Sequence, residues 1–171
     1  MSSGYGLAAE QSWVTMLQNR LHGEGYGYEV VNASIAGDTS AGGLARLPRL
    51  LATHDPEFLV IELGGNDGLR GQPVLSLREN LTKMIEIAQG HGARVVLTGI
   101  QIPPNYGPAY TRALADMYPE LAQQFDIPLV PFLLEGVALR PELMQQDQIH
   151  PNAEGQKIIF ENVWQVLAEL L

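Results

Sequence analysis

The amino-acid sequence predicts an α/β fold with a parallel β-sheet that helices cover on both faces. Four short apolar runs rich in β-branched residues alternate along the chain with segments of helical spacing. Two of these runs, residues 58–63 and 94–100, are nearly continuous Val, Ile and Leu, the pattern of strands buried on both faces. The 171 residues fit the usual size of one domain, without internal repeat or linker. We therefore expect a single domain over residues 1–171.

The predicted strands and helices follow one another in a regular order. The expected strands are residues 28–33, 58–63, 94–100 and 127–132. The first predicted helix covers residues 11–21, with Trp13, Leu17 and Leu21 on its buried face. Later helices have apolar faces made, in turn, of Leu77, Leu81, Met84, Ile85 and Ala88; of Tyr110, Leu114, Met117, Leu121 and Phe125; and of Ile159, Val163, Val166 and Leu170, which follow an expected N-cap at Asn152. We expect kinks or new first turns at Pro48 and Pro119.

The amino terminus departs from the usual order of such a fold. A doubly wound fold normally opens with a strand that leads into the first helix. Residues 1–9 are too short and too rich in glycine to form that strand. We therefore expect the first strand to be absent from this chain, as though the chain began one strand late.

Composition argues against several classes of protein. The 10 basic and 19 acidic side chains give a formal net charge of −9 at pH 7, so a basic face for nucleic acid or an anionic membrane surface is not expected. No apolar run approaches the roughly 18–20 residues that span a bilayer. The absence of cysteine excludes disulfides, thiol catalysis and cysteine metal sites. Residues 1–6 do not resemble a signal peptide, and the compartment stays open.

Candidate functional residues lie in the polar loops that follow the predicted strands. Ligands of open parallel sheets bind at the carboxyl ends of the strands, so we expect loops 32–40, 64–68 and 147–152 to meet there. Asp147 precedes His150 by three residues, a spacing at which the carboxylate can accept the Nδ1–H and leave Nε2 as a general base. The simpler alternative is a turn-forming aspartate followed by an ordinary loop histidine. The remaining histidines are expected to be solvated: His22, His54 and His91.

Gly37 and Asn66 are candidates for an oxyanion hole. A backbone N–H with no side chain in the way and a side-chain amide both donate well to a developing negative oxygen. The structural alternatives are a tight turn at Gly37, followed by a helix cap at Asp38 or Thr39, and a plain strand-to-helix turn through residues 64–67.

Taken together, these loops resemble blocks two, three and five of the SGNH (GDSL) hydrolase superfamily, in particular its bacterial thioesterase, lysophospholipase and arylesterase group. The matching segments include Ala36-Gly37-Asp38-Thr39-Ser40, Gly64-Gly65-Asn66-Asp67 and Asp147-Gln148-Ile149-His150. The resemblance covers essentially the whole chain in matching order. It implies a flavodoxin-like three-layer α/β/α sandwich with a parallel sheet. It also implies that Gly37 and Asn66 donate to the oxyanion, that Asp147 orients the base and that His150 is the base.

The chain departs from this family at block one, which is Gly-Asp-Ser followed by an apolar residue. Residues 1–6 match the part just after Gly-Asp-Ser, so the nucleophilic serine would fall one residue before Met1. The expected missing strand is the one that carries this serine in the family. Ser2, Ser3 and Asp38-Thr39-Ser40 do not align with it. We therefore expect the chain as written to be nearly inactive, as a fragment of a polypeptide that extends upstream.

The resemblance implies a serine-type hydrolase of small acyl esters or thioesters, and it implies no metal and no organic cofactor. The acidic composition argues against a nucleic-acid partner. Proteins of this group are usually periplasmic or secreted. Two alternatives stay open. One is a non-catalytic acyl-binding relative that keeps the cleft, and the other is a flavodoxin-like binder of nucleotide or flavin. The second is disfavoured because the sequence has no G-x-G-x-x-G or Walker pattern.

Overall fold

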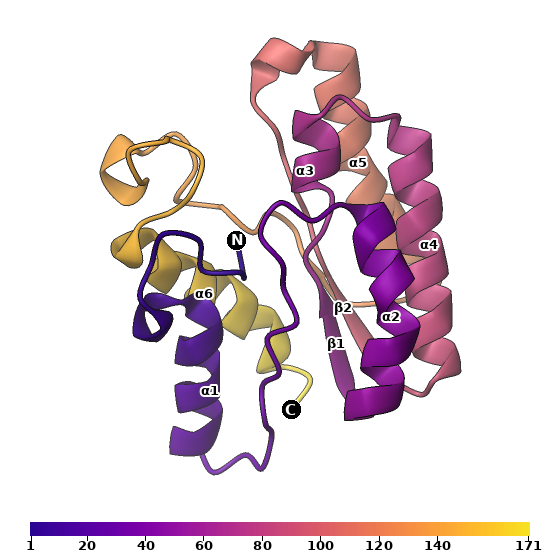
Figure 1. Ribbon diagram of the computed structural model, residues 1–171, viewed down its shortest axis with the longest axis vertical. Helices are drawn as coiled ribbons and strands as arrows, with labels where there is room; N and C mark the ends of the chain where they lie inside the picture. Colours follow the sequence, from indigo (N-terminus) through magenta and orange to yellow (C-terminus); the bar gives the residue numbers. More distant parts are fainter. The chain divides into compact units, whose positions relative to one another are not determined.

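The computed structural model describes all 171 residues of the chain. The residues divide into two compact units. The terminal unit consists of Met1–Ala36 and Leu133–Leu171, and the central unit consists of Gly37–Phe132. In the colour order of Figure 1 the central unit runs from violet through magenta to salmon.

The central unit is built on a parallel three-stranded sheet in the order β1-β2-β3. The strands are β1 (Phe58–Ile61), β2 (Arg94–Thr98) and β3 (Leu129–Val130). Phe58 pairs with Arg94, and Leu97 pairs with Leu129. These are the three later strands that the sequence predicts, each shorter than its apolar run. The predicted α/β class with a parallel sheet flanked by helices is confirmed.

One helix precedes the first strand of the central unit, and the others connect its strands. They are α2 (Ser40–His54), α3 (Gly65–Leu69), α4 (Val74–Gly90) and α5 (Pro108–Phe125), with a short 3-10 helix η2 (Pro104–Tyr106) before α5. Helix α4 packs against α2, α5 and β2. Figure 1 shows α2 and α4 side by side next to the strands. Helices α4 and α5 each lie between two strands in the chain, as expected for the crossover connections of a parallel sheet.

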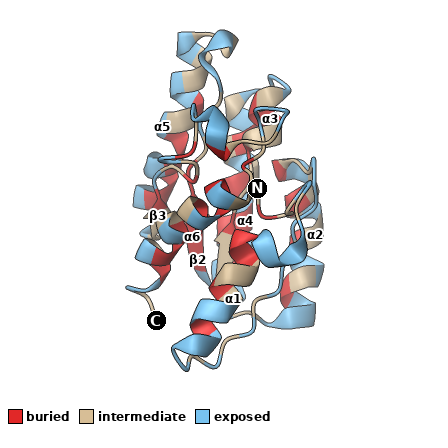
Figure 2. Cartoon of the chain, turned by 90° about the vertical axis from the view of Figure 1, so that its left-hand side faces the viewer, coloured by how far each residue is buried: buried red, intermediate tan, exposed pale blue.

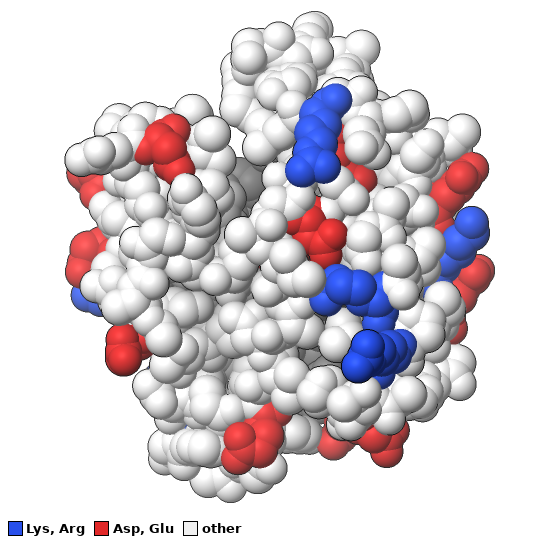
Figure 3. Space-filling model, viewed as in Figure 1, with Lys and Arg blue, Asp and Glu red and all other residues white.

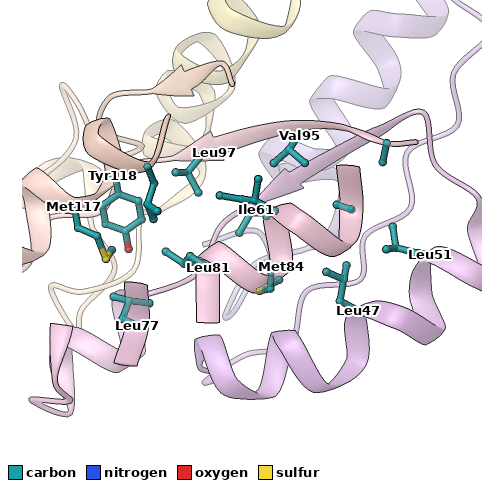
Figure 4. Close-up of a cluster of buried hydrophobic side chains, with 14 of the residues drawn as sticks. Leu47, Leu51, Ile61, Leu77, Leu81, Met84, Val95, Leu97, Met117 and Tyr118 are labelled. Carbon is teal, nitrogen blue, oxygen red and sulfur yellow. The ribbon is translucent and has the colours of Figure 1, made fainter. Parts of the chain in front are cut away.

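The hydrophobic core of the central unit lies where α4 meets the sheet. In Figure 4, Leu81 and Met84 of α4 point toward Ile61 of β1, with Leu47 of α2 beside Met84. Leu81 is fully buried, and burying a side chain of this size contributes about 1.5–3 kcal/mol. The predicted apolar face of this helix is confirmed, because all of its members are buried: Leu77, Leu81, Met84, Ile85 and Ala88.

The terminal unit packs α1 (Trp13–Gly23) against α6 (Ala153–Leu167). The backbone N–H of Trp13 donates to Oε1 of the buried Gln156 at 3.0 Å, which fixes the start of α1 on α6. Both helices show buried red patches in Figure 2. Two 3-10 helices complete the unit: η1 (Ala9–Gln11) and η3 (Pro141–Leu143).

Helix α1 begins two residues later than the predicted helix 11–21. Ser12 has an extended backbone, and its side chain accepts a hydrogen bond from the N–H of Val14. A serine in that conformation is a strong N-cap, so the helix begins at Trp13 rather than at Gln11.

The prediction of a strand at residues 28–33 is wrong. This segment belongs to no sheet, and Val31 is 54% exposed. A strand needs a neighbouring strand to take its backbone hydrogen bonds. Here the side chain of Gln18 takes two of them, because its Nε2 donates to the Tyr28 carbonyl and its Oε1 accepts from the Val30 N–H. The side-chain amide of Gln18 thus makes two of the backbone hydrogen bonds that a neighbouring strand would otherwise make.

Pro48 and Pro119 lie inside α2 and α5, and neither starts a new helix. A proline in a helix interior removes one backbone hydrogen bond. The apolar face of each helix offsets that loss, since Leu47 next to Pro48 and Tyr118 next to Pro119 are both buried.

The face drawn in Figure 3 consists mostly of residues other than Lys, Arg, Asp and Glu, and its small acidic and basic groups lie next to one another in several places. No helix of the chain combines the length and the apolar character that crossing a bilayer requires.

Candidate active site

Asp147 and His150 form a hydrogen-bonded pair in the terminal unit, as the sequence predicts. Oδ2 of Asp147 lies 2.7 Å from Nδ1 of His150. Oδ1 of Asp147 accepts from the backbone N–H groups of His150 at 3.0 Å and of Ile149 at 2.9 Å. One carboxylate therefore holds both the ring and the backbone of the histidine. An acceptor at Nδ1 favours the tautomer that carries its proton there, which leaves Nε2 to accept one.

The loop that carries this pair is anchored at both ends. The N–H of Gln145 donates to the His150 carbonyl at 2.7 Å, and Gln148 takes a left-handed conformation with φ of 56° to close the turn. Asn152 then caps α6, because its Oδ1 accepts from the N–H groups of Glu154 and Gly155. The predicted N-cap is confirmed, and the loop is fixed by local bonds.

The charge of Asp147 is stabilised by the same contacts. The backbone N–H of His150, then the His150 side chain and the N–H of Ile149, lower the pKa of Asp147 to about 2. The carboxylate stays ionised at neutral pH and can stabilise an imidazolium. The His150 side chain is 34% exposed, and its Nε2 has no hydrogen-bond partner in the chain. The ring of Tyr5 lies 4.7 Å from that of His150, centroid to centroid.

Gly37 has the backbone conformation of a tight turn in the central unit. Its φ is 77°, a region that side chains rarely adopt, although a Cβ placed there would meet no atom within 4 Å. The glycine is therefore required by the backbone angle rather than by lack of space. Its carbonyl accepts a hydrogen bond from Nη2 of Arg70 at 2.9 Å.

Asn66 lies in the first turn of α3, in the same unit as Gly37. Its Nδ2 donates to the Asp38 carbonyl at 2.9 Å. A side-chain amide has two N–H donors, and this bond uses one of those of Asn66. Gly64, two residues before Asn66, has φ of 115°, and a Cβ there would collide with the hydroxyl of Tyr118. The structure thus brings the Gly37 loop and the Asn66 turn together within the central unit. The Asp147–His150 pair lies within the terminal unit.

The other polar residues that the sequence singled out have structural environments. Thr39 is the N-cap of α2, its side chain accepting from the N–H of Gly42, so the predicted helix start is confirmed there. Ser40 is fully buried, and Ser2 is 4% exposed. The three remaining histidines are exposed, as predicted: His22, His54 and His91.

One buried acid of the site was missed by the sequence analysis. Asp67 is 1% exposed and accepts hydrogen bonds from both the N–H and the hydroxyl of Ser40. Its only signal in the sequence is its place beside Asn66 in a turn of glycines. No three His, Asp or Glu side chains of the chain gather closely enough to hold a metal ion.

Comparison with known proteins gives consistent matches over the chain. A model of the GDSL-like Lipase/Acylhydrolase family matches residues 1–158. The Esterase TesA of Pseudomonas aeruginosa is 54% identical over 171 residues, which are 100% of this chain and 85% of that protein. The Arylesterase of Vibrio mimicus is 46% identical over 100% of this chain and 86% of its own length.

Two further matches extend the comparison. The Thioesterase 1/protease 1/lysophospholipase L1 of Escherichia coli is 43% identical over 94% of this chain and 76% of its own length. A crystal structure of TesA matches 99% of this chain and 94% of its own with a TM-score of 0.96, at 55% sequence identity. The similarity in fold therefore extends over nearly the whole chain.

Proposed function

The chain belongs to the GDSL-like lipase/acylhydrolase family, and we propose that it contributes the base and the oxyanion hole of a serine-type hydrolase of acyl esters and thioesters. The relatives are an esterase, an arylesterase and a thioesterase/lysophospholipase, whose substrates share an acyl group on oxygen or sulfur. The observation that carries the proposal is the 2.7 Å contact between Asp147 and Nδ1 of His150, with Nε2 left unpartnered.

Each residue of the site has a role in this chemistry. Nε2 of His150 takes the proton from a serine hydroxyl as the serine oxygen attacks the acyl carbonyl. The same nitrogen returns the proton to the departing alcohol or thiol. Asp147 holds the tautomer and stabilises the imidazolium. The N–H of Gly37 and the second N–H of Asn66 donate to the negative oxygen of the tetrahedral intermediate. Water then releases the acid by the same steps.

We assign the nucleophile to none of residues 1–171. Ser40 is fully buried, with its hydroxyl bonded to Asp67, and Ser2 is 4% exposed. Ser3 lines a small open depression together with other residues near the amino terminus, among them Leu7 and Thr15. Loss of the nucleophile costs about 10⁶-fold in kcat in a triad enzyme. The 171-residue chain alone is therefore expected to be nearly inactive.

The test compares this chain with an extended chain, which we define as residues 1–171 preceded by an apolar strand ending in Gly-Asp-Ser. The extended chain is expected to hydrolyse p-nitrophenyl butyrate and to be labelled by a fluorophosphonate probe. The 171-residue chain is expected to do neither. In the extended chain, His150→Ala should abolish both signals. His54→Ala should change neither, because His54 is exposed at the end of α2.

Three outcomes would contradict the proposal. Turnover by the 171-residue chain that is lost in Ser2→Ala or Ser3→Ala would place the nucleophile within it. An extended chain that binds acyl esters but is neither labelled nor active would indicate a non-catalytic acyl-binding protein. A flavin absorbance band in the purified protein would indicate a flavin binder.

A further inference from the structure

The buried carboxylate of Asp67 joins two turns of the central unit that are far apart in the sequence. Its Oδ2 accepts from the N–H of Ser40 at 2.9 Å, and its Oδ1 accepts from the Ser40 hydroxyl at 2.6 Å. The Ser40 oxygen in turn accepts from Nδ2 of Asn80 on α4 at 2.9 Å. Ser40 is the first residue of α2, and Asp67 is the third residue of α3. The carboxylate therefore connects the beginnings of two helices.

These two helix beginnings carry the candidate oxyanion donors. Gly37 lies three residues before Ser40, and Asn66 directly precedes Asp67. Two other hydrogen bonds join the same turns, from Asn66 to the Asp38 carbonyl and from Arg70 to the Gly37 carbonyl. Both of these other bonds are at least partly exposed, whereas the Asp67–Ser40 contacts are buried. Among the hydrogen bonds that join the two turns, those of the Asp67 carboxylate are therefore the ones most protected from water.

A carboxylate suits this position better than a neutral group of the same shape. A buried charge is costly unless hydrogen bonds satisfy it, and Asp67 has two donors on one residue. An amide would present one acceptor oxygen, and its NH₂ would face a donor from Ser40. Charge-assisted hydrogen bonds are also shorter and about twice as strong as neutral ones. Replacing the acid by its amide should therefore loosen the contact while preserving its volume.

The negative charge of Asp67 also affects the hydroxyl of Tyr118, which forms a second hydrogen bond at the turn that carries Asn66. Burial raises the pKa of the Tyr118 hydroxyl, and the charges of Asp67 and Glu62 raise it further. The hydroxyl therefore stays protonated and donates to the Leu63 carbonyl at 2.9 Å. Leu63 leads directly into Gly64 and the turn that carries Asn66.

We propose that Asp67 is a positioning residue that sets the separation and orientation of the Gly37 N–H and the Asn66 side-chain amide. This inference rests on the proposed function, in which those two groups receive the oxyanion. An oxyanion hole acts through donors fixed before the reaction, so a small displacement of either one lowers kcat. The alternative role of Asp67 is only to cap the N-terminus of α2, which would affect stability and leave the two donors in place.

The first experiment measures geometry and needs no turnover. Asp67→Asn is introduced into the 171-residue chain, with Asp116→Asn as a control that removes an exposed carboxylate from α5 of the same unit. Amide resonances are followed by ¹H–¹⁵N NMR. In Asp67→Asn the backbone N–H of Gly37 and the side-chain NH₂ of Asn66 should shift, and the Ser40 N–H should exchange at least about tenfold faster. The control should leave all three unchanged.

Ser40→Ala keeps the experiment decisive if Asp67→Asn does not fold. It removes one donor to Asp67 and retains the backbone N–H, so the same resonances should shift by a smaller amount. If either folded variant speeds exchange at Ser40 while Gly37 and Asn66 keep their resonances, Asp67 only caps α2 and the proposal is overturned.

The second experiment separates this inference from the function on which it rests. In the extended chain, Asp67→Asn should lower kcat about 10–100-fold with KM nearly unchanged, because the donors are displaced rather than lost. If Asn66→Ala leaves kcat unchanged, the oxyanion role is wrong, whatever the resonances show. If Asn66→Ala lowers kcat but Asp67→Asn does not, the positioning role alone is wrong.

Discussion

The candidate site contains one contact between residues close in sequence and one between residues far apart in sequence. Asp147 and His150 are three positions apart, whereas Ser40 and Asp67 are 27 positions apart. The Asp147–His150 pair could be predicted from sequence because a carboxylate three positions from an imidazole reaches it within one turn. The contact of Asp67 with Ser40 could not, because it depends on how α2 and α3 pack. Local spacing thus predicted the Asp147–His150 contact, whereas the contact between the turns that carry Gly37 and Asn66 could be seen only in the fold.

The low pKa of Asp147 gives a prediction for His150→Ala. The backbone N–H of His150 is the largest cause of the low value, and alanine retains it. The pKa of Asp147, about 2 in the parent chain, should therefore rise only part of the way toward its ordinary value of 3.8. Carboxyl ¹³C NMR across an acid titration measures both values. A parent value at or above 3.8 would contradict the hydrogen bonding described here.

The lowered pKa of Asp147 also determines how this residue changes the stability of the fold with pH. A carboxylate whose pKa is lower in the folded state stabilises the fold above the unfolded pKa. The contribution of Asp147 is therefore complete above about pH 4 and is lost as the pH falls toward 2. Because the group is exposed, solvent screening keeps this contribution small.

The residues of the site should differ in their effect on turnover in the extended chain. His150→Ala removes the proposed base and should lower kcat by several orders of magnitude. Asp147→Ala leaves an imidazole free to take the wrong tautomer, so its loss should be smaller but still large. Asn66→Ala removes one oxyanion donor and should cost about 10²–10³-fold.

Steady-state kinetics on p-nitrophenyl butyrate checks these effects. KM should change little in all three variants, because the contacts strengthen only as charge develops. A protein that needs His54 and tolerates His150→Ala would have its active site elsewhere.

At the scale of elements, the N-cap residue of helix α6 also forms hydrogen bonds to the segment before the Asp147–His150 loop. Asn152 caps the helix, and its Nδ2 donates to the Glu142 carbonyl at 2.8 Å. Asn152→Ala should therefore lower the free energy of unfolding by about 1–2 kcal/mol. Urea denaturation measures the change, with Gln165→Ala on the exposed face of α6 as the matched control. An unfolding curve identical to that of the parent would show that the cap contributes nothing.

The elements that sequence predicted well are those defined by their own periodicity. The apolar positions of α4 are all buried, and Leu114, Met117 and Leu121 of α5 are buried too. At the end of the chain the pattern was less accurate, since α6 ends at Leu167 and buries Trp164 instead of Val166. The predicted strand 28–33 failed for a different reason. Its residues favour extended backbone, but pairing depends on a neighbouring strand that propensity cannot reveal.

For the whole molecule, the fold class followed from the alternation of strand and helix patterns, which is a property of the entire sequence. Division into two compact units was not predicted, because Met1–Ala36 and Leu133–Leu171 are joined only by tertiary packing. Packing between α1 and α6 joins the two ends of the chain into the terminal unit. The hydrogen bond from the backbone N–H of Trp13 to the side chain of the buried Gln156 is one contact of this packing. No local pattern relates positions 143 residues apart.

The buried hydroxyl of Tyr118 also gives the protein an optical marker of alkaline unfolding. The chain has six tyrosines, and burial followed by the charge of Asp67 raises the pKa of this one above its ordinary value of 10.0. Its neutral form stabilises the fold at lower pH, and that contribution is lost as the pH rises above about 10. The marker is read in a titration followed by phenolate absorbance. The absorbance of Tyr118 should appear only when circular dichroism reports loss of the fold, and in Tyr118→Phe that late step should disappear.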